Sequence, residues 1–256
     1  MVHEKRRWLM KILATADIHN TDLQSITPYV KGCDLVVLAG DFMPDHGRSN
    51  DQWLKSIFFL WCATVKVPIV LIPGNHDKYL RDVKLAVNWP ANVHYLLDSE
   101  IVINGVRFYG TPWSHWHGKK KKTPGLFEIG NEALRERFDA IPEGVDVLIS
   151  HAPPKVSGSE RHKLGLKQFM DGSSVLRKAI DKKTPRLVIC GHVHGNDHTP
   201  FRIGEIWVVC VSRAVGKDRC FPKYGPRLIT LCEDGVIEFA KIDKLSEDGL
   251  LTKADR

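Results

Sequence analysis

The sequence lacks any uninterrupted run of 18 apolar residues, so it predicts no transmembrane helix. It also lacks internal repeats, low-complexity segments and a recognisable linker between domains. Because 256 residues with 43% hydrophobic side chains can bury a large core, we expect a single α/β domain. That domain is expected to span residues 10–243, between a basic N-terminal arm at 1–9 and a polar tail at 244–256.

The cysteine pattern gives no sign of disulfide bonds, because the six cysteines form no C-x-x-C motif and no paired spacing. Free thiols fit a reducing compartment, so we expect a cytoplasmic protein. The basic start is followed by a short apolar stretch that runs directly into "ADIH", so no signal peptide is expected there. Five cysteines in or beside apolar runs are predicted to be buried: Cys33, Cys62, Cys190, Cys210 and Cys232.

The net charge of +7 is local rather than spread along the chain. Residues 1–11 carry a net +3 and the run Lys119–Lys122 carries +4, which leaves the remainder balanced (7 − 3 − 4 = 0). A broad nucleic-acid-binding stripe is therefore not expected. The lysine run is either a solvated loop or a lip that attracts anionic substrates.

Metal-capable side chains follow five apolar runs, each of the kind typical of a buried strand. An isolated pair such as His192 and His194 is compatible with an ordinary loop. Five such strand ends together indicate a ligand site, because ligands of open α/β sheets bind outside the carboxyl ends of the strands. The five segments are "KILATADIH", "DLVVLAGD", "VPIVLIPGNHD", "VDVLISH" and "RLVICGHVH".

These strand ends supply carboxylate, imidazole and amide ligands, and no thiol. This set suits divalent first-row ions such as manganese, iron or zinc. Seven candidates are too many for one tetrahedral catalytic zinc, but they fit two ions that share a bridging carboxylate. Two such ions form a clamp for in-line displacement at phosphorus. The candidate ligands are Asp17, His19, Asp41, Asn75, His151, His192 and His194.

In their order along the chain, "ADIH", "AGD", "PGNHD", "ISH" and "GHVH" resemble the motifs of the calcineurin-like metallophosphoesterases. The resemblance implies two mixed β-sheets packed as a sandwich and flanked by helices, an α/β fold of four layers. It assigns Asp17, His19, Asp41 and His194 to the first of two divalent ions, with Asp41 as the bridge. Asn75, His151 and His192 would complete the second site, with manganese as the first choice and iron, zinc, nickel or cobalt as alternatives.

The histidine after Asn75 has the position expected of a catalytic group. His76 could stabilise charge on the phosphoryl or leaving oxygen, while an in-line attack by a metal-bridging hydroxide breaks the bond. Asp77 could accept a hydrogen bond from the other ring nitrogen and fix the tautomer of His76. The alternative for His76 is a structural histidine in a turn.

Several features are similar to particular branches of that family. "YGTPWSHWH" and "SHAPP" resemble the class III cyclic-nucleotide phosphodiesterases and the small metallophosphoesterase-domain proteins. We therefore expect a metal-dependent phosphodiesterase that acts on small nucleotides or related diesters and has no membrane partner. A DNA or RNA nuclease, a phosphomonoesterase of the same family and a non-catalytic scaffold are the alternatives. The complete ligand set, including His192, argues against the scaffold.

The segment "TPWSHWHGKKKK" could contact the substrate. Trp113 and Trp116 could stack on a base, with His115 or His117 meeting phosphate. Equally, the indoles could pack the loop onto the core.

Several elements are predicted from local patterns. Helices are expected at 51–65, 131–141 and 172–183, the last with Ser173 or Ser174 as N-cap. Hairpins are expected at 99–113, around Asn104-Gly105, and in "RLITLCEDGVIEFAKI", around Asp234-Gly235.

Overall fold

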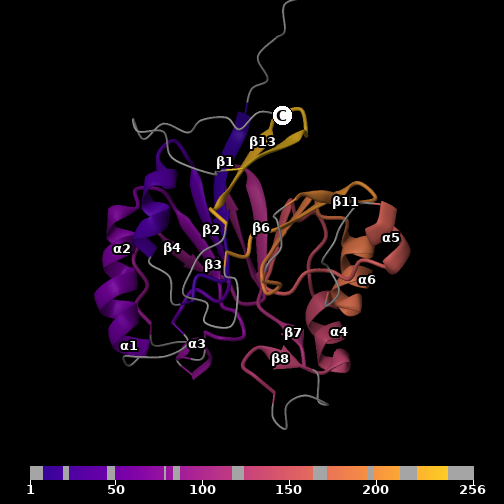
Figure 1. Cartoon of the computed structure of the whole chain (residues 1–256), viewed down its shortest axis with the longest axis horizontal. Helices are drawn as coiled ribbons and strands as arrows, with labels where there is room; N and C mark the ends of the chain where they lie inside the picture. Colours follow the sequence, from indigo (N-terminus) through magenta and orange to yellow (C-terminus); the bar gives the residue numbers. More distant parts are fainter. Residues whose placement is uncertain are drawn as a thin grey trace, which may run out of the picture.

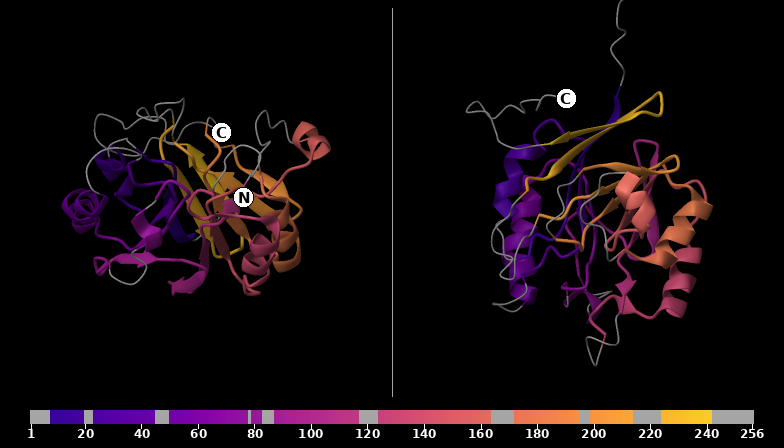
Figure 2. Two further views of the ribbon diagram at one scale, coloured as in Figure 1. Left: turned by 90° about the horizontal axis from the view of Figure 1, so that it is seen from below. Right: turned by 45° about the vertical axis from the view of Figure 1, so that its right-hand side comes forward.

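The computed structural model describes residues 8–19, 23–44, 50–77, 79–82, 87–116, 124–163, 172–194, 199–213 and 224–241. Two six-stranded mixed sheets form the centre of the molecule, and helices cover their outer faces (Figure 1). The views in Figure 2 show the same separation, with α1 and α2 on one flank and α4 and α6 on the other. The predicted four-layer α/β sandwich is therefore confirmed. Within the described residues, none of the helices has the length and hydrophobicity that crossing a bilayer requires.

The first sheet has the order β14-β13-β1-β2-β3-β4. Four of its strands are parallel, and the β13–β14 hairpin continues the sheet in antiparallel pairing beside β1. Trp8 and Leu9 belong to β1, although the sequence boundary placed them in the arm. The strands are β1 (Trp8–Thr15), β2 (Leu35–Ala39), β3 (Ile69–Ile72), β4 (Val93–Tyr95), β13 (Arg227–Cys232) and β14 (Ile237–Lys241).

The second sheet has the order β11-β12-β10-β9-β6-β5. Its four central strands are parallel, and an antiparallel strand closes each edge. The strands are β5 (Ser99–Ile103), β6 (Val106–Thr111), β9 (Val147–Ser150), β10 (Leu187–Cys190), β11 (Phe201–Ile203) and β12 (Ile206–Cys210). A separate two-stranded sheet, β7 (Ser114–His115) with β8 (Glu128–Ile129), was not predicted.

The helices lie where their apolar faces can be buried. A continuous helical run on the outer face of the first sheet comprises α1 (Asn50–Trp53), the π-helical η2 (Leu54–Phe58) and α2 (Phe59–Thr64), beside the 3-10 helix η1 (Leu23–Val30). The second sheet is covered by α4 (Asn131–Asp139) and α6 (Ser174–Lys183). Two short helices are α3 (Tyr79–Asp82) and α5 (Gly158–Lys163).

Most local predictions are confirmed by this arrangement. Ser173 is the N-cap of α6, and its Oγ accepts a hydrogen bond from the Leu176 amide at 3.1 Å. Asn104 and Gly105 turn between β5 and β6 with φ of 50° and 78°, as a tight hairpin of this type requires. Asp234 and Gly235 turn between β13 and β14, where Gly235 has φ of 84°.

The core between the two sheets contains apolar side chains from both, including Ile12, Val37, Phe108 and Ile189. Gly110 of β6 lies close to Ile72 of β3 and to Leu96. A Cβ atom there would lie 2.4 Å from Leu96 Cβ and 2.6 Å from Ile72 Cγ2. The absence of a side chain at this position thus allows Leu96 and Ile72 to pack directly against the backbone of β6.

Replacing Gly110 by alanine should therefore overpack the core. We expect a loss of about 1–3 kcal/mol in the free energy of unfolding, because neither Leu96 nor Ile72 can retreat from its buried position. Thermal unfolding measures this as a drop of roughly 2–12 °C. Gly130→Ala is the control, since a Cβ there meets no atom within 4 Å. Equal melting temperatures of the two variants would contradict the close sheet contact.

Candidate metal centre

The candidate ligands come from both sheets and meet at one edge of the molecule. Asp17 and His19 follow β1, Asp41 follows β2, and residues 75–77 follow β3. His151 follows β9 in the second sheet, and residues 191–194 follow β10. Since these strands are parallel within each sheet, their carboxyl ends place all of these residues at the same edge.

Backbone hydrogen bonds join the two sheets at this edge. The Ala16 amide donates to the Val211 carbonyl at 3.0 Å, and the Arg213 amide donates to the Ala16 carbonyl at 3.0 Å. His151 Nδ1 also lies 3.0 Å from the Ala39 carbonyl oxygen, which fixes the ring of a second-sheet residue to a first-sheet strand. The two halves of the centre are therefore held in register by contacts with the main chain.

Four of the candidate ligands have left-handed backbone conformations. Asp17, His19, Asp41 and His192 have φ of 52°, 46°, 53° and 69°. Such conformations cost about 1–3 kcal/mol each for residues other than glycine. Contacts with the surrounding structure hold these residues in the strained conformation. In this conformation the short loops direct the four side chains toward one another at the ends of the strands.

Asp17, His19 and His194 form the first group of side chains. His19 Nε2 lies 3.3 Å from His194 Nε2, and His194 Nε2 lies 3.2 Å from Asp17 Oδ1. One ligand atom from each residue lies within 4.8 Å of the others, so the three can hold one metal ion.

Asn75, His151 and His192 converge in a second group. Asn75 Oδ1 lies 3.0 Å from both His151 Nε2 and His192 Nδ1. Asp41 Oδ2 lies 3.3 Å from His151 Nε2 and 3.7 Å from His19 Nε2, so this carboxylate lies between the two groups. Asp17, Asp41 and His151 also qualify as a set that can hold an ion.

The buried carboxylates of Asp17 and Asp41 are stable only when positive charge lies nearby. Burial alone raises the pKa of Asp41, but the charge of His151 and its hydrogen bond outweigh it and hold the pKa below its usual range. Burial lowers the pKa of His151, yet the carboxylates of Asp41 and Asp17 raise it to about 10. His192 behaves differently, because burial and the neighbouring His151 lower its pKa to about 4. The carboxylates thus draw cations to the centre, and a metal ion can supply that charge.

His76 lies at the border of the first group. Its backbone amide donates to Asp41 Oδ1 at 2.7 Å, and its half-buried ring meets the His19 ring edge-on with 5.1 Å between centroids. A side chain in this position can approach a group bound at the centre without being one of the converging ligands.

Asp77 has a role that the sequence did not reveal. Its buried carboxylate accepts hydrogen bonds from the amides of Gly74, Asp41 and Met43, each at 2.8 Å. Burial and the nearby Asp41 carboxylate raise the pKa of Asp77 to about 8, while its amide bonds oppose this. Asp77 therefore holds the loops after β2 and β3 together. Its orientation of the His76 ring stays a prediction.

The predicted substrate-contacting residues have diverse surroundings. Trp113 packs against the apolar core on the outer face of the second sheet, and its Nε1 donates to Asp98 Oδ2 at 2.7 Å. The Arg137 guanidinium carbon lies 5.0 Å from the centre of the Trp113 ring, so the contacts of this side chain are structural. His115 and Trp116 are half-buried at β7, and the Trp116 indole nitrogen is buried without a hydrogen-bond partner among the described residues. His117 lies outside the described residues, as do Lys119–Lys122.

Comparison with known proteins identifies the family. The sequence profile of the calcineurin-like phosphoesterases matches residues 10–196, and the chain belongs to this family. It is 27% identical over 220 residues to human metallophosphoesterase domain-containing protein 1, covering 72% of this chain and 60% of that protein. It is 26% identical over 190 residues to the 3′,5′-cyclic adenosine monophosphate phosphodiesterase CpdA of Escherichia coli K12, covering 70% and 61%.

The same fold occurs in the crystal structure of TT1561 of Thermus thermophilus. The two have a TM-score of 0.62 and 19% sequence identity, with coverage of 91% of this chain and 98% of that one. The chain spans about 60% of the length of the curated relatives named above.

Glycines between the strands and the ligands make the centre sensitive to added atoms. A Cβ atom on Gly74 would lie 2.2 Å from Asp41 Oδ1 and 2.7 Å from His151 Cε1. We expect Gly74→Ala to displace both side chains and to lose most of the bound metal, measured by elemental analysis of purified protein. Gly110→Ala is the matched control, because it crowds the core without touching a candidate ligand. Full metal content in Gly74→Ala would contradict this geometry.

Proposed function

We propose that this protein is a phosphodiesterase that depends on two divalent metal ions and hydrolyses small nucleotide diesters, such as cyclic nucleotides. The observation that carries the proposal is the position of Asp41. One of its oxygens lies between His19 of the first group and His151 of the second, at 3.7 and 3.3 Å. A carboxylate shared in this way is what a pair of adjacent ions requires.

The side chains present fit two ions in kind and in number. Their donor set of carboxylate oxygens, imidazole nitrogens and an amide oxygen suits divalent first-row metals, and manganese is our first choice. Asp17, His19, Asp41 and His194 would hold the first ion. Asp41, Asn75, His151 and His192 would hold the second. When bound, the ions would neutralise the phosphodiester and lower the pKa of water near them.

The protein's own groups would orient the substrate and stabilise the developing charge. His76 borders the first group and has its backbone fixed by Asp41, so its ring can donate to a phosphoryl or leaving oxygen. Asp77 would keep this loop in place through the amides of Gly74, Asp41 and Met43. Placing donors in advance avoids reorganisation during the reaction.

The nucleotide preference is supported by the segment around β7 and by one relative. Trp116 directly follows β7, which ends at His115, and both side chains are half-buried, so part of each is accessible to a substrate. The CpdA relative bears the name of a cyclic-nucleotide phosphodiesterase. A nuclease or phosphomonoesterase with the same centre is the alternative. The five described cysteines are free and buried, which supports a reducing compartment such as the cytoplasm.

A metal-by-substrate screen tests the proposal. Apoprotein reloaded with manganese, iron, zinc, nickel or cobalt would be assayed with cyclic nucleotides, bis-p-nitrophenyl phosphate, p-nitrophenyl phosphate and single-stranded DNA. We expect metal-dependent turnover of the diesters, with cyclic nucleotides preferred.

Asp41→Asn should reduce the content of both ions and remove nearly all activity, whereas Asp17→Asn should mainly empty one site. Asp139→Asn, on an exposed residue, is the control. Preference for the monoester or for DNA would favour an alternative, and two ions retained in Asp41→Asn would refute the bridge.

His76→Ala should separate chemistry from metal binding. We expect both ions to remain, with kcat lower by about 10²–10⁴-fold, the usual effect of one acid–base or electrostatic group. If His76 protonates the leaving oxygen, the loss should be smaller for p-nitrophenolate than for a ribose oxygen. His94→Ala, in β4, is the control for loss of an imidazole. An equal loss for both leaving groups would instead favour stabilisation of the phosphoryl charge.

A further inference from the structure

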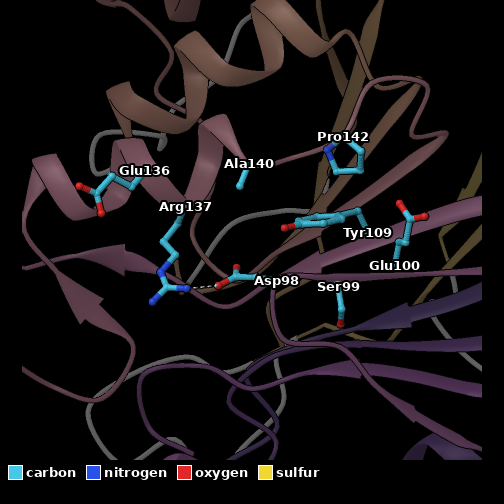
Figure 3. A pocket seen from close by; sticks show the side chains of 8 residues that line it. All are labelled: Asp98, Ser99, Glu100, Tyr109, Glu136, Arg137, Ala140 and Pro142. Atoms are coloured by element: carbon cyan, nitrogen blue, oxygen red, sulfur yellow. Dashed lines mark hydrogen bonds and ion pairs between the residues drawn. The ribbon is translucent and has the colours of Figure 1, made fainter.

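Polar contacts beside the second sheet differ in whether they reach the metal centre. A hollow of about 840 Å³ lies between β5, β6 and α4 (Figure 3). Its Asp98 and Arg137 point toward one another and form an ion pair at 3.3 Å, which joins α4 to the residue before β5. None of the residues that line this hollow is a candidate ligand. A buried thiol at the end of β12, in contrast, contacts a loop that carries two candidate ligands.

This thiol belongs to Cys210, the last residue of β12. The side chain is buried in the apolar cluster that α4 and α6 cover, and it lies opposite Cys190 of the neighbouring strand β10. Cys210 Sγ lies 3.6 Å from the Gly191 carbonyl oxygen and 3.8 Å from the Val193 carbonyl oxygen. A thiol is a weak hydrogen-bond donor, and both oxygens are within its reach. Cys210 therefore contacts the backbone of the loop 191–194.

The amides and the carbonyls of this loop are bound by different neighbours. The His192 amide donates to Asp17 Oδ2 at 2.8 Å, and the Gly191 amide donates to the His151 carbonyl at 2.9 Å. The thiol of Cys210 can donate to the carbonyls of Gly191 and Val193. Without the thiol, the contacts through the amides would remain, but the two peptide carbonyls would lose this donor.

The orientation of these peptides matters because the two histidines of the loop reach different groups of ligands. His192 Nδ1 lies 3.0 Å from Asn75 Oδ1 in the second group, and His194 Nε2 lies 3.2 Å from Asp17 Oδ1 in the first. The thiol contacts the peptides directly before and directly after His192, whose left-handed φ of 69° must be held by its surroundings. Rotation of either peptide would turn an imidazole away from its group.

We propose that Cys210 is a positioning residue of the metal centre, and that its thiol holds the loop 191–194 so that His192 and His194 reach different metal ions. This inference rests on the two-metal centre of the proposed function. The thiol acts through the loop and not as a ligand, because neither set of converging ligand atoms includes a sulfur. Mutation of groups that orient metal ligands in this way typically changes metal affinity or activity by about 10- to 100-fold.

The alternative is that Cys210 only fills space in the apolar cluster. Buried cysteines often pack as small hydrophobic residues. In that case, truncation of the side chain would lower the stability of the protein and leave the affinity for metal unchanged. Stability and metal affinity must therefore be measured on the same variants.

Calorimetric titration of the metal-free full chain with manganese tests the proposal. Cys210→Ala removes the donor and should weaken binding at both sites by about 10-fold, the lower end of the usual range, because a thiol is a weak donor. Cys210→Ser keeps a donor and should restore most of the affinity, even where Tm falls. Val208→Ala is the control, since it removes buried volume from the same face of β12 two residues earlier. It should lower Tm and leave the affinity unchanged.

Amide hydrogen exchange of the metal-free chain gives a second measurement, which does not depend on metal binding. The amides of residues 191–193 should exchange about 2- to 10-fold faster in Cys210→Ala than in Val208→Ala, as for the loss of one hydrogen bond. Amides of β2 in the first sheet serve as the internal reference.

The two measurements separate failure of this inference from failure of the proposed function. Wild-type affinity in Cys210→Ala would overturn the positioning role, and so would a loss that Cys210→Ser does not reduce. An absence of metal binding by the wild-type chain would refute the proposed function. The exchange measurement would then still decide whether the thiol holds the loop, since equal exchange in Cys210→Ala and Val208→Ala would show that it does not.

Discussion

The main-chain hydrogen bonds between Ala16 and residues 211–213 are the contact on which the rest of the structure depends. They join the end of β1 to the segment after β12 and so fix one sheet against the other at the edge where the strands end. Asp17 follows Ala16 directly, and the neighbouring β10 leads into His192. A shift of either sheet would separate Asn75 from His151 and His192. The geometry of the site therefore depends on how the two sheets pack.

The second constraint is electrostatic. Asp17, Asp41 and Asp77 are buried close to one another in space, and burial of carboxylates is costly unless each is paired. Asp77 accepts hydrogen bonds from three backbone amides, which hold the loops after β2 and β3 together. Asp17 and Asp41 instead face imidazoles, whose nitrogens can hold a cation together with these carboxylates. The difference between the loop-holding carboxylate of Asp77 and the two candidate ligands Asp17 and Asp41 follows from what each one contacts.

Much of this could be predicted from the sequence, because strand periodicity and residue type are local signals. The helix N-cap at Ser173 and both glycine turns are of this kind, whereas the sandwich of two sheets was implied by the resemblance to the calcineurin-like family. Packing of Trp113 was one of two alternatives that the sequence left open. Its partner Asp98 and the amides that bind Asp77 could not be predicted, because these partners are distant in sequence, as Met43 is from Asp77. Left-handed backbone at Asp17, His19, Asp41 and His192 also escaped prediction, since it arises only where the completed fold sustains the strain.

The position of β1 has a consequence for how the chain folds. This strand lies inside its sheet between β2 and β13, with Ile12 opposite both Leu35 and Ile229. The second edge of β1 can therefore pair only after β13 has been made, more than 200 residues later in the sequence. Contacts of such long sequence separation slow folding and leave an apolar strand edge exposed during synthesis. Before β13 pairs with β1, this unpaired edge can bind other chains. The partly folded chain is therefore prone to aggregation and is a target for chaperones at this stage.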